Sequence, residues 1–96
     1  ELPMSNTYEI TIRPANPDHL QQLSALIDSD ATKPGGGVTD GAVNLETNAR
    51  NLPALMQEVE NMASDAAMSL EIVISCDAEG PDYRRVITIE NGKQLI

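Results

Sequence analysis

The chain has 96 residues, with 15 acidic and six basic side chains and a formal net charge of −9 at pH 7. This charge argues against direct nucleic-acid binding, which depends on Lys and Arg at phosphates, and base stacking would need more aromatic rings than two tyrosines. A single cysteine excludes an internal disulfide, and no apolar run reaches the roughly 20 residues of a membrane span.

Length and termini predict one cytoplasmic domain over residues 1–96. A chain of about 100 residues can bury roughly two-thirds of its unfolded surface without disulfides or a structural metal. The N-terminus lacks the basic and apolar regions of a signal peptide, and a free thiol fits a reducing compartment. Glu1-Leu2-Pro3 precede a natural-looking start at Met4, so we expect them to derive from an expression vector.

The first expected elements are a strand and a helix. Residues 8–13 alternate between apolar and polar side chains, as a half-buried strand does, and Pro14 ends the run. Asn16 can then cap a helix of about three turns, and Pro17 suits its first turn. We interpret His19, in the same turn, as a solvent-facing polar residue. The apolar stripe of this helix consists of Leu20, Leu23, Leu26 and Ile27.

Residues 28–41 predict a flexible, glycine-rich loop. Their glycines are not a phosphate cradle, because Lys33 precedes them and no P-loop register leads into a helix. Asp40-Gly41 is typical of a type I′ hairpin turn, here between a short arm and a strand at 42–46.

A long amphipathic helix is expected from residue 51 to residue 66. Asn51 can cap its start by accepting a backbone hydrogen bond, and Pro53 fits the first turn. Three acids lie away from its apolar face, namely Glu58, Glu60 and Asp65. The apolar residues recur every three or four positions: Leu52, Leu55, Met56, Val59, Met62, Ala63 and Ala66.

Two alternating runs, 70–76 and 83–90, predict an antiparallel hairpin that we expect to be central in its sheet. Cys76 falls on the apolar face of the first run, where a free cysteine is usually a small buried hydrophobe. Asn91-Gly92 favours a further tight turn into a short last strand at 94–96. The connection between the two long strands carries three more acids: Asp77, Glu79 and Asp82.

This element order predicts an α+β fold, with a mostly antiparallel sheet and two helices on one face. If the Asp40-Gly41 hairpin forms, the first six elements read β-α-β-β-α-β. That is the ferredoxin-like arrangement, here followed by a C-terminal hairpin strand.

The sequence shows no catalytic constellation, so we expect a protein that is not an enzyme. His19 has no evident carboxylate or nucleophile to work with, and Cys76 is expected to be buried. One Cys and one His cannot hold a metal unless carboxylates supply the other ligands. We therefore predict neither cofactor nor metal.

The leading hypothesis is a small acidic module that binds a basic protein partner. Toxin-neutralising immunity proteins and phage-encoded inhibitors of host nucleases or defence complexes are similar in size and charge. The expected partner-binding residues are the six acids of the second helix and the hairpin turn: Glu58, Glu60, Asp65, Asp77, Glu79 and Asp82.

The alternative is a structural or regulatory subunit that self-associates. Its contact would be the uncovered sheet face, with Val73, Ser75, Val86 and Thr88, or the last strand as a free edge. A monomer would favour the inhibitor and a homodimer the subunit.

Overall fold

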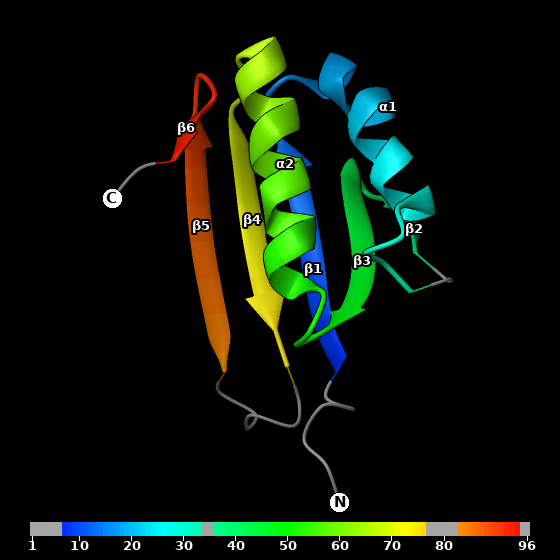
Figure 1. Ribbon diagram of the computed structural model, residues 1–96. Coiled ribbons are helices and arrows are strands. Elements are labelled where there is room, and N and C mark those ends of the chain that lie inside the picture. The colour runs from blue at the N-terminus through cyan, green and yellow to red at the C-terminus, as the bar shows by residue number, and fades with distance from the viewer. Residues whose placement is uncertain (1–6, 34–35, 77–82, 95–96) are drawn as a thin grey trace, which may run out of the picture.

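The computed structural model describes residues 7–33, 36–76 and 83–94, which form a six-stranded antiparallel sheet with two helical segments on one face (Figure 1). The strand order is β2-β3-β1-β4-β5-β6. The α+β class and the two helices on one face are therefore confirmed, while the ferredoxin-like name stays a prediction. The strands are β1 (Thr7–Pro14), β2 (Gly37–Thr39), β3 (Ala42–Asn48), β4 (Leu70–Ser75), β5 (Arg84–Glu90) and β6 (Lys93–Gln94).

The central strands are β1 and β4. The expectation that the β4–β5 hairpin is central is wrong for β5, whose outer side pairs only at Ile89 and Glu90 with the short β6 within the described residues. Alternation alone cannot distinguish these positions, because every strand that covers the core alternates.

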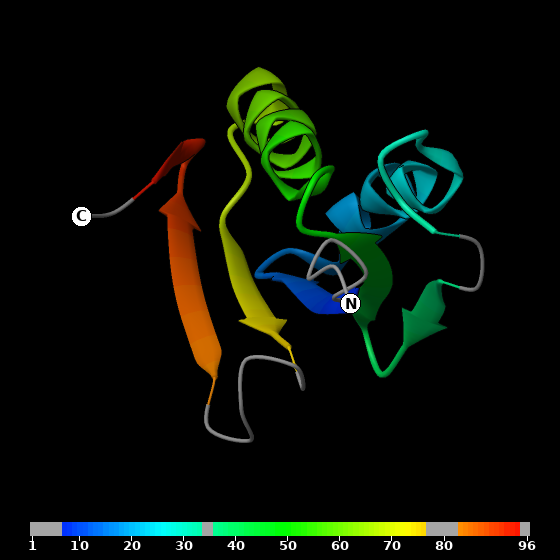
Figure 2. The same cartoon turned by 60° about the horizontal axis from the view of Figure 1, so that its bottom comes forward.

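The first helical segment runs without a break through η2 (Pro17–His19), α1 (Leu20–Leu23) and η3 (Ser24–Asp28), so only its middle turn is α-helical. The Asn16 cap is confirmed, because its side-chain oxygen accepts a hydrogen bond from the Asp18 backbone N–H at 2.9 Å. Figure 2 shows this segment and α2 (Leu52–Ala66) on the same side of the sheet. None of the described helices is long and apolar enough to cross a membrane.

The start of α2 is organised by Asn48 and not, as expected, by Asn51. The Asn51 backbone is itself helical (φ −96°, ψ −9°) and its side chain makes no cap. Its N–H donates to the side-chain oxygen of Asn48 at 2.8 Å. An N-cap residue normally has extended dihedral angles, so a helical Asn51 cannot turn its side chain back onto the first turn.

The hydrophobic core lies between the helices and the sheet. Leu55, Val59 and Ala63 of α2 have no exposed surface. They pack in one cluster with apolar side chains of the sheet, including Ile10, Ile12, Leu45, Ile72, Ile74 and Ile89. Cys76 is 2 % exposed, as expected for a buried thiol.

One polar side chain, Thr47, is buried in the described core. Its hydroxyl donates to the Ala31 carbonyl at 2.6 Å. Beside this bond, the backbone N–H of Lys33 donates a hydrogen bond to the Glu46 carbonyl at 2.7 Å. These bonds hold residues 31–33 against β3 and cover the part of its edge that β2 does not reach.

Both expected hairpin turns form. Asp40 and Gly41 have φ values of 55° and 76°, and Asn91 and Gly92 have 52° and 84°. Positive φ at both central residues is the signature of a type I′ turn. The residues of the other expected turn, 78–82, lie outside the described residues, as do residues 1–3, 34–35 and 95–96.

Candidate protein-binding surface

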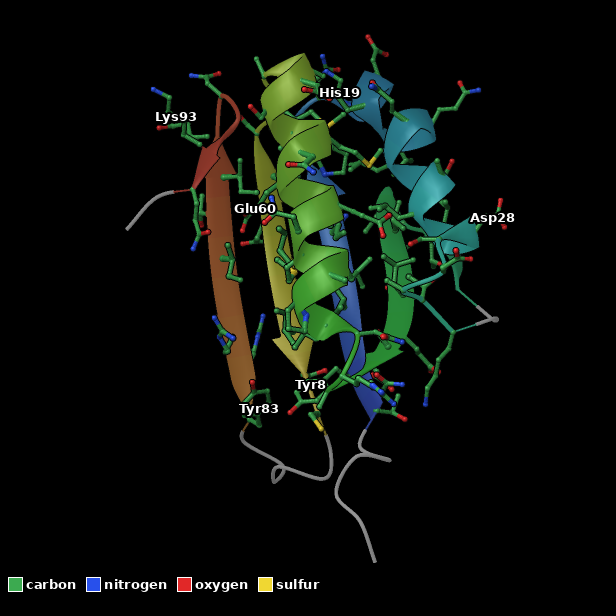
Figure 3. The ribbon with its side chains drawn as sticks, viewed as in Figure 1. Tyr8, His19, Asp28, Glu60, Tyr83 and Lys93 are labelled. Carbon is green, nitrogen blue, oxygen red and sulfur yellow. The ribbon has the colours of Figure 1, made fainter. Side chains whose placement is uncertain are left out.

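The structure does not bring the three nominated acids of α2 onto one face. Glu58 and Asp65 are seven residues apart, close to two full turns, so they share one flank. Glu60 lies on the other flank, nearer β5 (Figure 3). Glu58 and Glu60 are both half-buried, and Glu58 accepts a hydrogen bond from the Ser29 hydroxyl at 2.7 Å. The other three nominated residues lie outside the described residues: Asp77, Glu79 and Asp82.

The helical layer, which we define as residues 17–30 and 52–66, is negative throughout. Neither Lys nor Arg occurs in it. Glu60 and Asp65 make no side-chain hydrogen bond or ion pair within the described structure. Asp28 is exposed and points away from the molecule (Figure 3). The six acids of the layer are Asp18, Asp28, Asp30, Glu58, Glu60 and Asp65.

The strands, in contrast, are electrically balanced. The six described strands hold four acids and four bases. The remaining two bases of the chain, Lys33 and Arg50, lie in connections. The net negative charge of the described structure is therefore concentrated on the helical side.

The opposite side of the sheet, here called the open face, is not covered by any described element (Figure 2). Strand register fixes its rows of side chains. One row runs across β3, β1, β4 and β5 as Glu46, Glu9, Ser75 and Arg84. The next row is Asn44, Thr11, Val73 and Val86, and a third is Arg13, Glu71 and Thr88.

Rows with charged side chains flank a row of uncharged ones on this face. Val86 is 54 % exposed and lies beside the half-buried Val73. The Thr11 hydroxyl donates to the side-chain oxygen of Asn44 at 3.2 Å. Arg13 reaches across β3 and donates to the carbonyl of Asp40 at 2.6 Å, which fixes its side chain over the first hairpin turn.

Within the described structure, two depressions are lined mainly by residues of the sheet. The larger, about 290 Å³, lies at the end where Arg13, Glu71 and Thr88 meet. The smaller, about 130 Å³, lies between Glu9 and Glu46. Among the described residues, no group of three or more His, Cys, Asp or Glu side chains could hold a metal ion.

The interpretation of His19 as a solvent-facing side chain is wrong in part. The residue is half-buried, and its Nδ1 is fully covered without a hydrogen-bond partner in the described structure. Figure 3 shows His19 next to the C-terminal end of α2. Periodicity could not indicate this, because the position falls at the 3₁₀ start of the segment.

Sequence reasoning noted the acids of α2 but missed that the whole helical layer lacks bases. The signal was available, because residues 17–30 and 52–66 can be searched for Lys and Arg once they are assigned as helical. The rows of the open face could not be predicted from the sequence, since they depend on which strands pair and in which register. Comparison with known proteins adds no relative: no protein family, no curated protein and no solved structure matches the chain.

Proposed function

We propose that the chain is a small, non-enzymatic protein-binding module of the inhibitor or immunity type. It occludes a basic surface of a protein partner, such as a toxin, a nuclease or a host defence complex. It acts in the cytoplasm, without cofactor or metal. The helical layer is its binding surface.

The observation that supports this proposal is the separation of charge between the two layers. The helical layer contains six acids and no Lys or Arg, whereas the described strands contain equal numbers of acids and bases. A surface of one sign attracts an oppositely charged partner over a Debye length of about 8 to 10 Å and speeds its approach. The same total charge spread evenly would give a weaker local field.

The proposal relies most on three acids of the helical layer. Asp28, Glu60 and Asp65 have no side-chain hydrogen bond or ion pair within the described structure. Glu58 accepts a hydrogen bond from the Ser29 hydroxyl. Replacing Glu58 would therefore break this contact between the end of η3 and α2 as well as remove a charge. The acids at 77, 79 and 82 remain part of the proposed surface on the basis of the sequence.

Two variants with equal charge test the proposal. The first replaces the three free acids of the helical layer (Asp28→Asn, Glu60→Gln, Asp65→Asn). The matched control replaces three exposed acids of the open face (Glu9→Gln, Glu46→Gln, Glu71→Gln). Each variant is used as bait to capture partners from host lysate at low and high salt, and mass spectrometry identifies the proteins retained.

We expect wild type to retain a basic protein at low salt and to lose it at high salt. The helical-layer variant should retain much less of that protein, because the loss of steering charges slows association, by about tenfold. The control should stay close to wild type. Equal loss in both variants would show that only net charge matters, and a partner indifferent to salt would remove the electrostatic basis of the proposal.

A further inference from the structure

The charges in two rows of the open face are arranged so that each of these rows complements itself. In the first row, the acids Glu46 and Glu9 lie on β3 and β1, and the base Arg84 lies on β5. In the third row the order is reversed, with Arg13 on β1 and Glu71 on β4. In both rows, the acids and the base lie on opposite sides of the boundary between the two central strands, β1 and β4.

We propose that a second copy of this chain packs on the open face, related by a two-fold axis that runs along the strands between β1 and β4. Such an axis places β1 of one copy against β4 of the other, and β3 against β5. Each row of one copy then lies against the same row of the other copy. Glu46 then faces the partner's Arg84, and Arg13 turns from the Asp40 carbonyl to face the partner's Glu71. Thr11 faces the partner's Val73 in the middle row.

An isologous contact repeats each of these pairs, so one dimer gains four pairs of opposite charge. The exposed Val86 and its neighbour Val73 are covered at the same time, which removes apolar surface from water. The helical layers of both copies remain outside. A homodimer is also what the alternative, self-associating subunit would form, but because this contact leaves both helical layers outside, it does not compete with the proposed function.

The size of the face indicates which class of interface to expect. Four strands about 4.8 Å apart, each of about seven residues rising about 3.3 Å, present a plane of roughly 20 by 23 Å per copy. A contact of this size buries on the order of 1,000 Å² in total, at the lower end of specific interfaces. Contacts at this end of the range are typical of transient association, so we expect a weak, reversible dimer.

Charge reversal provides the test. Glu46→Arg alone places two bases opposite each other, and Arg84→Glu alone places two acids opposite each other. Each variant should self-associate at least tenfold more weakly than wild type in sedimentation equilibrium. An equimolar mixture should restore a heterodimer, because Arg at 46 on one copy then meets Glu at 84 on the other.

The control is Asp65→Arg, which makes the same change of charge on the helical layer and should leave the dimer intact. Circular dichroism checks that each variant folds. Glu46→Gln and Arg84→Gln, with a several-fold weakening expected for each, replace any reversal that does not fold. Wild type that stays monomeric across the concentration series overturns the inference. So does a dimer that persists in Glu46→Arg, or a mixture that forms no heterodimer.

Discussion

Gly36 passes so close to β3 that a side chain would require the backbone to shift. A Cβ there would lie 2.7 Å from the Asn44 carbonyl oxygen, whereas a Cβ on the neighbouring Gly37 would meet nothing within 4 Å. Gly36→Ala should therefore reduce the free energy of unfolding by about 1 to 3 kcal/mol, the usual effect of overpacking. Gly37→Ala should change it by less than about 0.5 kcal/mol. Urea unfolding measures both, and equal midpoints would show that the chain can move away from β3 without penalty.

Ala67 ends α2 in a left-handed conformation, with a φ of 50°. The following N–H, from Met68, donates to the Ala63 carbonyl at 2.9 Å, which completes a Schellman motif. Glycine is the residue that takes this conformation without steric strain. Ala67→Gly should stabilise the protein by about 1 kcal/mol, measured as a higher denaturant midpoint.

The neighbouring Ala66→Gly is the control for Ala67→Gly. Residue 66 is the last helical residue of α2, so glycine there should destabilise by about 1 kcal/mol. The two variants differ by one position and should move the midpoint in opposite directions. A shift of the same sign in both would contradict the role assigned to the left-handed residue.

At the scale of elements, the β5–β6 hairpin is attached to the C-terminal end of α2. The Gly92 N–H donates to the Met68 carbonyl at 2.8 Å, and a Cβ on Gly92 would lie 2.9 Å from the Ala63 carbonyl oxygen. Gly41 occupies the same position of the other type I′ turn but has open space around it, with Arg13 Nη1 at 3.7 Å. Both glycines have a positive φ, but Gly92 is closely packed and Gly41 is not.

Substitution of each glycine by Ala separates these two contributions. Gly41→Ala should cost about 1 to 2 kcal/mol of unfolding free energy, because alanine is strained at positive φ. Gly92→Ala should cost about 1 to 3 kcal/mol more, because α2 must also shift. Thermal or urea unfolding gives both values, and similar losses would mean that the hairpin does not depend on its contact with α2.

Elements that bury one face could be predicted from the sequence nearly to the residue. The alternation at 8–13, 70–76 and 83–90 predicted β1, β4 and β5, and the period of three or four predicted α2, because each pattern repeats with the geometry of its element. The dipeptides Asp40-Gly41 and Asn91-Gly92 predicted their turns for a local reason as well, since few residues accept positive φ.

What the sequence could not indicate depends on contacts between distant segments. Asn48 and Asn51 are both suited to a helix start, and the path of the chain after β3 decides that Asn48 supplies the oxygen. Burial of Thr47 depends on the Ala31 carbonyl, 16 residues earlier. The rows of the open face depend likewise on the pairing of β3, β1, β4 and β5.

For the whole molecule, the separation of charge has a consequence that requires no partner. The acids of the helical layer repel one another without compensating bases, whereas those of the strands have bases among them. At low ionic strength, the helical-layer variant (Asp28→Asn, Glu60→Gln, Asp65→Asn) should therefore be more stable than wild type by a few tenths to about 1 kcal/mol. Urea unfolding at low and at physiological salt measures the difference.

Added salt should reduce this gain, because screening weakens repulsion between exposed charges that lie a Debye length of about 8 to 10 Å or more apart. The open-face variant (Glu9→Gln, Glu46→Gln, Glu71→Gln) removes the same number of charges but also removes attraction to Arg13 and Arg84, so it should gain less at low salt. If both variants gain equally, total charge and not its placement governs repulsion. The helical layer would then have no special electrostatic character for a basic partner to recognise.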